Sequence, residues 1–309
     1  MTCGEGWHFF SSCQAIPCDR KRNKSYIRGI ILKHTHILKT NHTGLAPLIA
    51  LCALPMLSAC DWFDYHPYCV DISGETFINS TNAERIEALT KGRKSFRFAL
   101  ISDTQRWYDD TEDLVRELNS RTDIDFIIHA GDLTDFGVNK EFLWQRDILS
   151  DLNVPYTAVI GNHDCLGTGK QTYSRVWGDL NYAFTAGDVR FICINTNALE
   201  FDYSRPVPDL NFLYSEMDSF PEECDRTIIV QHCRPFDDEF NNNIARFFHE
   251  VIKRMPGFMF SVSGHTHRIT HDDLFDDGVI YHSTTCVNDR AYLIFDIQKD
   301  GYTYEVVTF

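Results

Sequence analysis

The stretch Phe258-Met259-Phe260-Ser261-Val262-Ser263-Gly264-His265-Thr266-His267 joins an apolar run to a closely spaced pair of histidines. Earlier parts of the chain repeat this arrangement, with a short apolar run followed by a polar cluster. The clusters are Ser102-Asp103-Thr104-Gln105, Gly131-Asp132-Leu133-Thr134-Asp135 and Gly161-Asn162-His163-Asp164. Short apolar runs bounded by such residues are typical of buried strands. The pattern therefore places carboxylates, an amide and imidazoles at the ends of several strands.

The spacing of these clusters indicates the fold class. Asp103 and Asp132 are 29 residues apart, and Asp132 and Asn162 are 30 residues apart. A further histidine, His232, follows the apolar run 227–230 and precedes His265 by 33 residues. Each interval can hold one helix and one strand, which makes a βαβ unit. We therefore predict an α/β fold with its site at the carboxyl ends of the strands.

The later part of the chain is richer in strand patterns. A hairpin is predicted from residues 182–186 and 189–195, and further strands from 279–284, 291–297 and 302–308. Helix and strand units followed by a β-rich tail favour two packed sheets with helices outside.

Two segments, 165–179 and 198–208, are expected to be loops that shape specificity. They contain Tyr173, Trp177, Tyr203 and Arg205. The aromatic side chains either contact a nucleoside or sugar or only pack.

The residue types in the polar clusters are those that bind divalent metal ions. Carboxylate and amide oxygens suit hard ions, whereas imidazole suits the later transition metals. Asp132 can bridge two ions because its carboxylate has two oxygens, and His265 and His267 share one face because they lie two residues apart. Two adjacent cations neutralise a phosphate ester and generate hydroxide from bound water. The clusters therefore predict a two-metal hydrolytic site.

The order of these motifs resembles that of the calcineurin-like metallophosphoesterase superfamily, over residues from about 96 to 309. The superfamily pattern is Asp-x-His, Gly-Asp, Gly-Asn-His-Asp, His and Gly-His-x-His. The chain departs from it at Gln105, which stands in the first motif where His is expected, as it does in one branch of the superfamily. The resemblance implies a four-layer αββα sandwich of two mixed β-sheets flanked by helices.

The resemblance also implies two divalent metal ions, drawn from Mn, Fe, Zn and Mg. Their implied ligands are Asp132 as the bridge, Asp103, Gln105 and His267 for one ion, and Asn162, His232 and His265 for the other. Gln105 is either a direct ligand or a residue that lines the site through water. Since an amide oxygen is a weaker donor than imidazole for late transition metals, its ion is expected to be Mn or Mg rather than Zn.

The resemblance assigns the remaining motif residues to catalysis. His163 would face the leaving group and donate a proton to the departing alkoxide. Asp164 would hold the other nitrogen of the His163 ring, unless it is only a turn residue. Arg106 and Arg268 directly follow ligand motifs, and they either bind phosphate oxygens or face the solvent.

Other polar residues near the motifs are expected to be structural. His129 lies inside an apolar run, so we expect it in the core or behind the ligands. Asp135 is expected to cap the helix after the bridging loop. Cys233 follows His232 directly and is expected not to be a ligand.

Two functions of different classes remain. The first is a dimetal-dependent phosphoesterase that hydrolyses a phosphomonoester or phosphodiester with metal-activated hydroxide. The second is a lipid-anchored binding protein with the same fold and little or no turnover, which the change at Gln105 suggests. The presence of His163 and Asn162 favours the enzyme, because a decayed site is expected to lose these residues early.

The charge of the chain constrains its partners. It carries 29 Lys and Arg residues against 44 Asp and Glu, a net charge of −15. Beyond residue 59, 42 acidic residues stand against 22 basic ones, and an acidic surface repels nucleic acid. We therefore expect a small phosphate-ester substrate and no nucleic acid.

The first 59 residues have the composition of a leader. A basic stretch, 33–39, precedes the apolar run 45–59, which is short for a membrane span but suits a signal peptide. The run ends in Leu57-Ser58-Ala59-Cys60, which resembles a bacterial lipobox. The resemblance implies lipidation of Cys60 and a lipid-anchored protein of the bacterial cell envelope, periplasmic or surface-facing. A buried helix with a chance cysteine is the alternative.

The leader also predicts how the chain is divided. Residues 1–36 are longer than the basic segment of a signal peptide, so translation is expected to start near Ile37 or Leu38 and residues 1–36 are interpreted as an artefact of gene prediction. Residues 60–95 are predicted to be a tether and N-terminal extension, and residues 96–309 the catalytic domain.

Overall fold

The structure, a computed structural model, describes residues 69–201 and 206–309. The leader predicted for residues 1–59, the predicted lipidation site Cys60, and the loop residues Tyr203 and Arg205 lie outside the described residues. Within the described part of the chain, no helix combines the length and the apolar character needed to cross a membrane.

The helices and strands alternate along most of the described chain. In order they are α3 (Ile78–Thr90), β1 (Phe96–Ile101), α4 (Tyr108–Ser120), β2 (Phe126–His129), α5 (Asn139–Leu149), β3 (Tyr156–Ala158), α6 (Gly169–Val176), β4 (Tyr182–Ala186), β5 (Val189–Cys193), α7 (Leu210–Asp218), β6 (Arg226–Val230), α8 (Ala245–Ile252), β7 (Phe258–Ser263), β8 (Thr270–Asp273), β9 (Ile280–Ser283), β10 (Ala291–Gln298) and β11 (Gly301–Thr308). Single 3₁₀ turns interrupt the loops at His163–Cys165, Ala198–Glu200 and Val287–Asp289.

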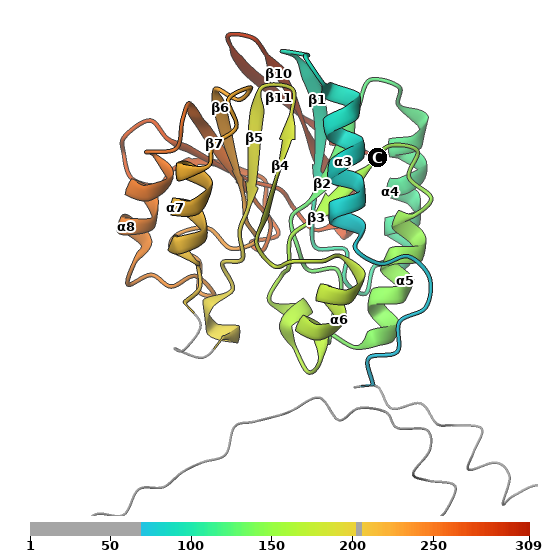
Figure 1. Ribbon diagram of the computed structural model, residues 1–309. Helices are drawn as coiled ribbons and strands as arrows, with labels where there is room; N and C mark the ends of the chain where they lie inside the picture. The colour runs from blue at the N-terminus through green and yellow to red at the C-terminus, as the bar shows by residue number, and fades with distance from the viewer. Residues whose placement is uncertain (1–68, 202–205) are drawn as a thin grey trace, which may run out of the picture. The chain divides into compact units, whose positions relative to one another are not determined.

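Two mixed sheets form the centre of this part of the chain, as predicted (Figure 1). The first sheet has the strand order β11-β10-β1-β2-β3, with β1, β2 and β3 parallel and β10 and β11 antiparallel. The second has the order β4-β5-β6-β7-β9-β8, with β5, β6, β7 and β9 parallel and both edge strands antiparallel. Parallel pairing brings the carboxyl ends of several strands to one edge of each sheet.

The alternation of apolar residues along the strands separates the layers. In β1, Phe98 and Leu100 are buried between the two sheets, whereas Ala99 faces the helix layer of α4 and α5, because successive side chains point to opposite faces. The ring of Phe98 lies edge-on to Phe191 of β5, with centroids 5.4 Å apart, so aromatic packing joins the sheets.

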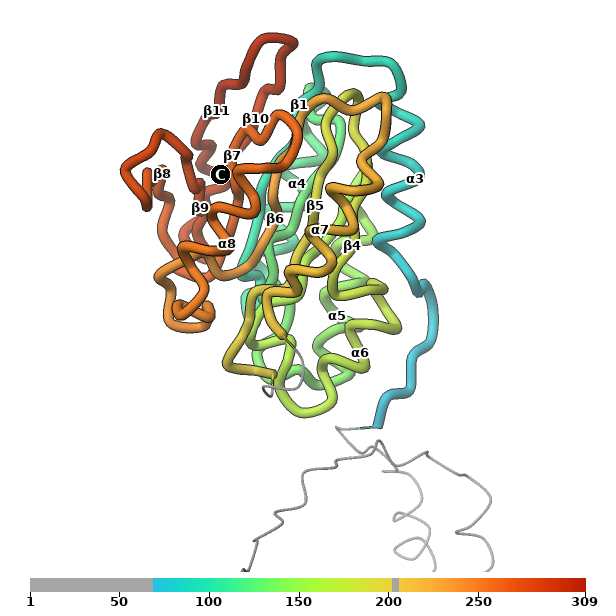
Figure 2. Tube along the Cα trace, turned by 60° about the vertical axis from the view of Figure 1, so that its left-hand side comes forward, coloured from blue at the N-terminus to red at the C-terminus, as the bar shows by residue number. Residues whose placement is uncertain are grey.

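A third apolar cluster packs the other face of the second sheet against α7 and α8. Figures 1 and 2 show these two helices on one side of the sandwich and α4, α5 and α6 on the other. The predicted four-layer αββα sandwich is therefore confirmed.

Helix α3 covers the edge where the two sheets meet, since it packs on β3 and β4, the edge strands. The side chain of Asn79 pairs with the backbone of Ala158: its Nδ2 donates to the carbonyl oxygen and its Oδ1 accepts from the amide, both at 2.9 Å. An amide side chain here satisfies strand groups that would otherwise be exposed at an open edge.

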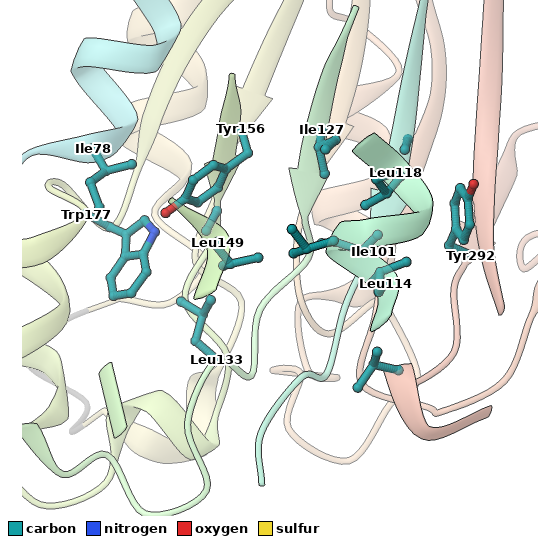
Figure 3. Close-up of a cluster of buried hydrophobic side chains, with 14 of the residues drawn as sticks. Ile78, Ile101, Leu114, Leu118, Ile127, Leu133, Leu149, Tyr156, Trp177 and Tyr292 are labelled. Carbon is teal, nitrogen blue, oxygen red and sulfur yellow. The ribbon is translucent and has the colours of Figure 1, made fainter. Parts of the chain in front are cut away.

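The expected loop 165–179 contains helix α6, so its aromatic residues have a different role from a substrate contact. Tyr173 and Trp177 are fully buried, and their rings stack with centroids 5.8 Å apart. Figure 3 shows Trp177 among Ile78 and Tyr156 in the core under the helices. These aromatic side chains pack, and they do not line the site.

Candidate metal centre and active site

The polar residues that follow β1, β2, β3, β6 and β7 meet at one end of the sandwich. Asp103, Asp132 and His232 are all buried, and one ligand atom of each lies within 4.8 Å of the other two. They come from loops of both sheets, so the site lies where the carboxyl ends of the two sheets approach each other. The cavities of about 230 Å³ and about 770 Å³ both lie along α3 and are not lined by these residues.

One half of the site gathers around the side-chain oxygen of Asn162. This Oδ1 lies 3.0 Å from Nε2 of His232 and 3.1 Å from Nδ1 of His265. Nε2 of His232 also lies 3.4 Å from Oδ1 of Asp132. Since Nδ1 of His232 donates to the carbonyl oxygen of Ala130 at 2.7 Å, its Nε2 is the nitrogen left for a ligand. The residues predicted for one ion are therefore brought together.

The other half gathers around Asp103. Its Oδ1 lies 3.1 Å from Nε2 of the half-exposed His267, and its Oδ2 accepts from the backbone N–H of His265 at 3.1 Å. Nε2 of Gln105 donates to Oδ2 of Asp132 at 3.4 Å, a long contact. Asp132 thus touches both halves, which is the position that a bridging carboxylate requires.

The side-chain oxygen of Gln105 tests whether this half fits a cation. Oε1 is buried, and it has no hydrogen-bond partner among the described residues. A buried acceptor without a partner costs about 1–3 kcal/mol. A cation would satisfy this oxygen, so Gln105 fits a ligand better than a residue that only lines the site.

The electrostatics of the site favour bound positive charge. Burial opposes ionisation of Asp103, but the hydrogen bond from His267 and the nearby His232 lower its pKa to about 2. Burial likewise opposes protonation of His232, yet Asp132 and Asp103 raise its pKa to about 10. The hydrogen bond with Asp103 is the main reason that the pKa of His267 also rises to about 10. The carboxylates therefore draw cationic charge into a buried place.

The backbone at the site is held in conformations that side chains other than glycine rarely adopt. Asp103, Asp132, His265 and His267 all have positive φ, between 50° and 68°. Such residues persist only where the surroundings fix them, and they cluster at functional sites.

Two motif glycines allow the loops to approach each other. A Cβ on Gly161 would lie 2.1 Å from Oδ1 of Asp132, and a Cβ on Gly264 would lie 1.9 Å from Oγ of Ser102. Any side chain at these positions would push the ligand loops apart.

His163 lies beside the ligands, but its partner differs from the predicted one. Its backbone N–H donates to Oδ1 of Asp132 at 3.0 Å, and its ring Nδ1 donates to the carbonyl oxygen of Asp135 at 2.9 Å. The carboxylate of Asp135 lies 3.7 Å from the same nitrogen. The expected contact with Asp164 is therefore wrong, and Asp135 holds the ring instead.

Asp164 is a buried residue that joins two loops. Its carboxylate accepts from the backbone N–H groups of Gly161, Leu133 and Thr134 and from the hydroxyl of Thr134, at 2.8–3.1 Å. Burial and the charge of Asp132 raise its pKa to about 7, while these four donors favour the ionised form. We therefore assign Asp164 a positioning role, since it ties the loop after β3 to the loop after β2.

Other expectations near the site have mixed outcomes. His129 is buried, as expected, with Nε2 2.9 Å from the hydroxyl of Thr104. Asp135 does not cap α5; that end is held by Glu141, whose carboxylate accepts from Phe136 N–H at 2.9 Å. Arg106 pairs with Asp135, and Arg268 is exposed.

The thiol of Cys233 hydrogen-bonds to an amide side chain. It is buried and donates to Oδ1 of Asn197 at 3.2 Å, although His232 and His265 lie close to it. Burial raises its pKa well above the ordinary value, so the thiol stays protonated.

The sequence placed Asp135 in the second polar cluster but with the wrong role, and it did not single out Asp238 at all. Oδ1 of Asp238 lies 2.9 Å from Nε2 of His265, although the side chain is 88% exposed. Asp238 lies in a loop outside the spaced motifs, so no sequence signal separates it from ordinary surface carboxylates.

Comparisons with known proteins agree with this arrangement. A family model for calcineurin-like phosphoesterases matches residues 96–268. No curated protein sequence matches the chain significantly. Similar solved structures include a dimetal phosphatase from Danio rerio, with 14% identity and a TM-score of 0.53, where the match covers 69% of this chain and 99% of that one.

Two further structures are similar at this level. GAP50, the anchor in the inner membrane complex of Plasmodium, has 14% identity and a TM-score of 0.56, with 70% of this chain and 85% of that chain covered. Purple acid phosphatase PPD1 from yellow lupin seeds has 13% identity and a TM-score of 0.54, with 71% and 52% covered, so this chain spans about half of that enzyme. At such identities the likeness shows the fold alone.

Proposed function

Because the chain belongs to the calcineurin-like phosphoesterase family, we propose that it is a dimetal-dependent phosphoesterase that hydrolyses a phosphomonoester or a phosphodiester. The observation that carries this proposal is the meeting of Asp103, Asp132, Asn162 and His232 at one end of both sheets. The unpaired Oε1 of Gln105 adds a donor atom that a cation would satisfy.

Most of these residues would hold the metal ions, and a separate residue would transfer a proton. Two divalent cations, when bound, would neutralise the charge of the phosphate ester and activate water. Asp132 contacts both halves of the site, so it is the residue suited to sharing its two oxygens. The mixed oxygen and nitrogen donors suit Mn²⁺, Fe²⁺ or Zn²⁺, and the amide at Gln105 favours the harder ions among them.

His163 is placed to deliver a proton to the leaving group. Its Nδ1–H is occupied by the carbonyl oxygen of Asp135, so Nε2 is the atom that faces a reacting group. The side chain is 34% exposed, which allows contact with a substrate in the open site. A positioned imidazole of this kind typically contributes about 10²–10⁴ in rate.

The alternative is a binding protein with little turnover. The fold does not decide between the two, since one similar structure is described as an anchor. What favours the enzyme is that His163 keeps an oriented ring beside a complete set of ligands. A binding site without turnover would not require an exposed imidazole whose Nδ1–H is fixed by a hydrogen bond.

The proposal is tested with purified protein, an aryl phosphate monoester and the corresponding diester. Hydrolysis is expected with added Mn²⁺, loss after treatment with a chelator, and recovery when metal is returned. The variant Asp132→Asn, which weakens the shared ligand while keeping its shape, is expected to be inactive under the same conditions. Turnover that survives chelation would contradict the metal-dependent mechanism.

We further propose that the protein is anchored to the cell envelope by a lipid on Cys60. The support is the order of basic stretch, apolar run and Leu57-Ser58-Ala59-Cys60 in the sequence. One acyl chain binds a membrane reversibly, so a stable anchor needs several chains. The variant Cys60→Ser should move the protein to the soluble fraction or leave it unprocessed. Wild-type protein found in the cytosol with residues before Cys60 attached would contradict this.

A further inference from the structure

The loops that contact His163 carry large apolar side chains that are exposed. Phe136 is 63% exposed and Leu166 is 36% exposed. Phe136 follows Asp135, whose carbonyl oxygen accepts from the His163 ring, and the backbone N–H of Leu166 donates to the carbonyl oxygen of His163 at 3.3 Å. The two loops touch, because a Cβ on Gly137 would lie 2.3 Å from the carbonyl oxygen of Leu166. An apolar surface therefore adjoins the proposed proton donor.

Exposed apolar side chains also occur on the loops after β5 and β6. Phe236 is 57% exposed, its ring packs against Phe275 with centroids 5.1 Å apart, and it lies two residues before Asp238, whose carboxylate contacts the ring of His265. Leu199 is 69% exposed, and the amide of its neighbour Ala198 donates to the carbonyl oxygen of Glu239 at 2.8 Å. Leu199 and Phe236 thus lie on loops that follow β5 and β6, as Phe136 and Leu166 lie on loops that follow β2 and β3. We call these four residues the apolar rim.

The charges around the apolar rim disfavour a substrate with many phosphate groups. Arg106 is paired with Asp135, and Arg234 is paired with Asp237 and Asp272. Nζ of Lys170 donates to the carbonyl oxygen of Glu200 at 2.8 Å.

Carboxylates add to this effect. Asp238 is almost fully exposed beside His265, and Arg268, which follows His267, is an exposed cation that suits a single phosphate group. Anionic charge beyond that group would meet acidic side chains.

We infer that the substrate carries one phosphate group and an apolar organic substituent, and that Phe136 and Leu166 bind this substituent on the leaving-group side of the site. This inference rests on the proposed function. It follows from position: His163 would face the leaving group, and Phe136 and Leu166 lie on the two loops that contact its ring and its backbone. Apolar surface exposed here is covered when an alkyl or aryl leaving group is bound.

The test uses n-alkyl phosphates of increasing length, because their leaving groups differ little in pKa and the chemical step stays constant. A fully buried methylene contributes about a threefold to fourfold change in binding. The apolar rim is open, so we expect a smaller gain, about tenfold in kcat/KM from butyl to octyl phosphate. Glycerol phosphate, with a polar leaving group, should be a poorer substrate than butyl phosphate.

Variants connect this preference to the named residues. Phe136→Ser and Leu166→Ser should reduce the octyl-to-butyl ratio to about threefold or less. Leu89→Ser is the matched control: Leu89 is 54% exposed in the last turn of α3, next to Thr90, whose hydroxyl accepts from Gly187 N–H in the β4–β5 turn. This variant should keep the wild-type ratio, and thermal melting should show that all three variants are folded.

Binding of alkylphosphonates to the Mn²⁺-loaded protein separates the inference from the proposed function. These compounds have a P–C bond in place of the ester P–O–C linkage, so they are not hydrolysed. Calorimetry therefore measures affinity without turnover. Tighter binding of octylphosphonate than of butylphosphonate, reduced in Phe136→Ser, supports the inference even if no ester is hydrolysed. Equal affinities for the two phosphonates would overturn the inference. A chain-length effect that persists in both Phe136→Ser and Leu166→Ser would also overturn it, because the apolar substituent would then bind elsewhere.

Discussion

Replacing Gln105 by Met should make the metal-free protein more stable and should reduce the stabilisation that metal binding adds. The side chain of Gln105 is buried, its Oε1 has no partner among the described residues, and its Nε2 makes a long contact of 3.4 Å with Asp132. Met has a similar volume and no polar atoms that need a partner. The substitution therefore removes an unsatisfied acceptor while giving up one weak hydrogen bond.

The two terms can be compared. Relief of a buried unsatisfied oxygen is worth about 1–3 kcal/mol, and a long hydrogen bond at most about 1 kcal/mol. The metal-free variant should gain about 1–2 kcal/mol, and each kcal/mol raises Tm by about 2–4 °C for a domain of this size. Loss of one ligand should weaken metal binding by at least about tenfold, which removes about 1.4 kcal/mol of metal-induced stabilisation.

The assay is thermal melting of wild-type and variant protein, in chelator and across a Mn²⁺ titration. Gln231→Met is the matched control, since Gln231 is also buried with an unpaired Oε1 but its Nε2 donates to Oγ of Ser261 at 3.0 Å. It should change the metal-free Tm and leave the Mn²⁺-induced shift unchanged. Gln105→His should do the opposite of Gln105→Met and tighten one site only, since imidazole is the stronger donor.

Two results together would contradict a ligand role for Gln105. If Gln105→Met lowers Tm in chelator and leaves the Mn²⁺-induced shift as in the wild type, the oxygen does not face a cation. Gln105 would then line the site without binding metal, and one ion would have only Asp103, Asp132 and His267 as ligands.

His163→Ala should lower kcat by about 10²–10⁴ with unchanged metal content, and the loss should shrink for aryl leaving groups that need no proton; an equal loss for alkyl and aryl esters would indicate a positioning role instead. His282 is buried among aromatic rings, and burial lowers its pKa from 6.5 to about 3, so below pH 6.5 the unfolded chain binds a proton that the folded chain does not. Stability measured by denaturant unfolding should therefore fall as pH drops from about 6.5 towards 3, and His282→Phe should make that fall shallower; a variant with the wild-type pH dependence would contradict this account.

The strands that carry the site could be predicted because their apolar runs alternate between two buried faces. The apolar runs that precede Ser102 and Gly264 form β1 (Phe96–Ile101) and β7 (Phe258–Ser263), as the sequence predicts. β8 was not predicted, since Thr270–Asp273 is polar throughout and is stabilised by pairing with β9 at the sheet edge. Helix α6 was not predicted because it is short. Such a helix is stabilised by packing of its apolar residues in the core, and the sequence alone does not show this packing.

At the site, the spacing of the motifs predicted the positions of the ligands but not the partner of His163. The predicted ligands follow strand ends, so the topology brings them together. The partner of His163 was mispredicted because adjacent residues in a helical turn point in different directions, and Asp164 therefore turns away from the ring. The actual partner, Asp135, comes from the loop after β2, which is near in space and 28 residues away in sequence.

Asp132 makes the two halves of the site depend on one another through the backbone as well as through a shared carboxylate. Its carbonyl oxygen accepts from the N–H groups of Thr104 and Gln105 at 3.0 and 3.1 Å, and its carboxylate accepts from the N–H of His163. A shift of this one residue would therefore move ligands in the first and third motifs together. Because Asp132 itself has a positive φ of 59°, it holds its place only while those contacts are made. The ligand loops thus form one cooperative unit, and a substitution at Asp132 should affect binding of both ions rather than of one.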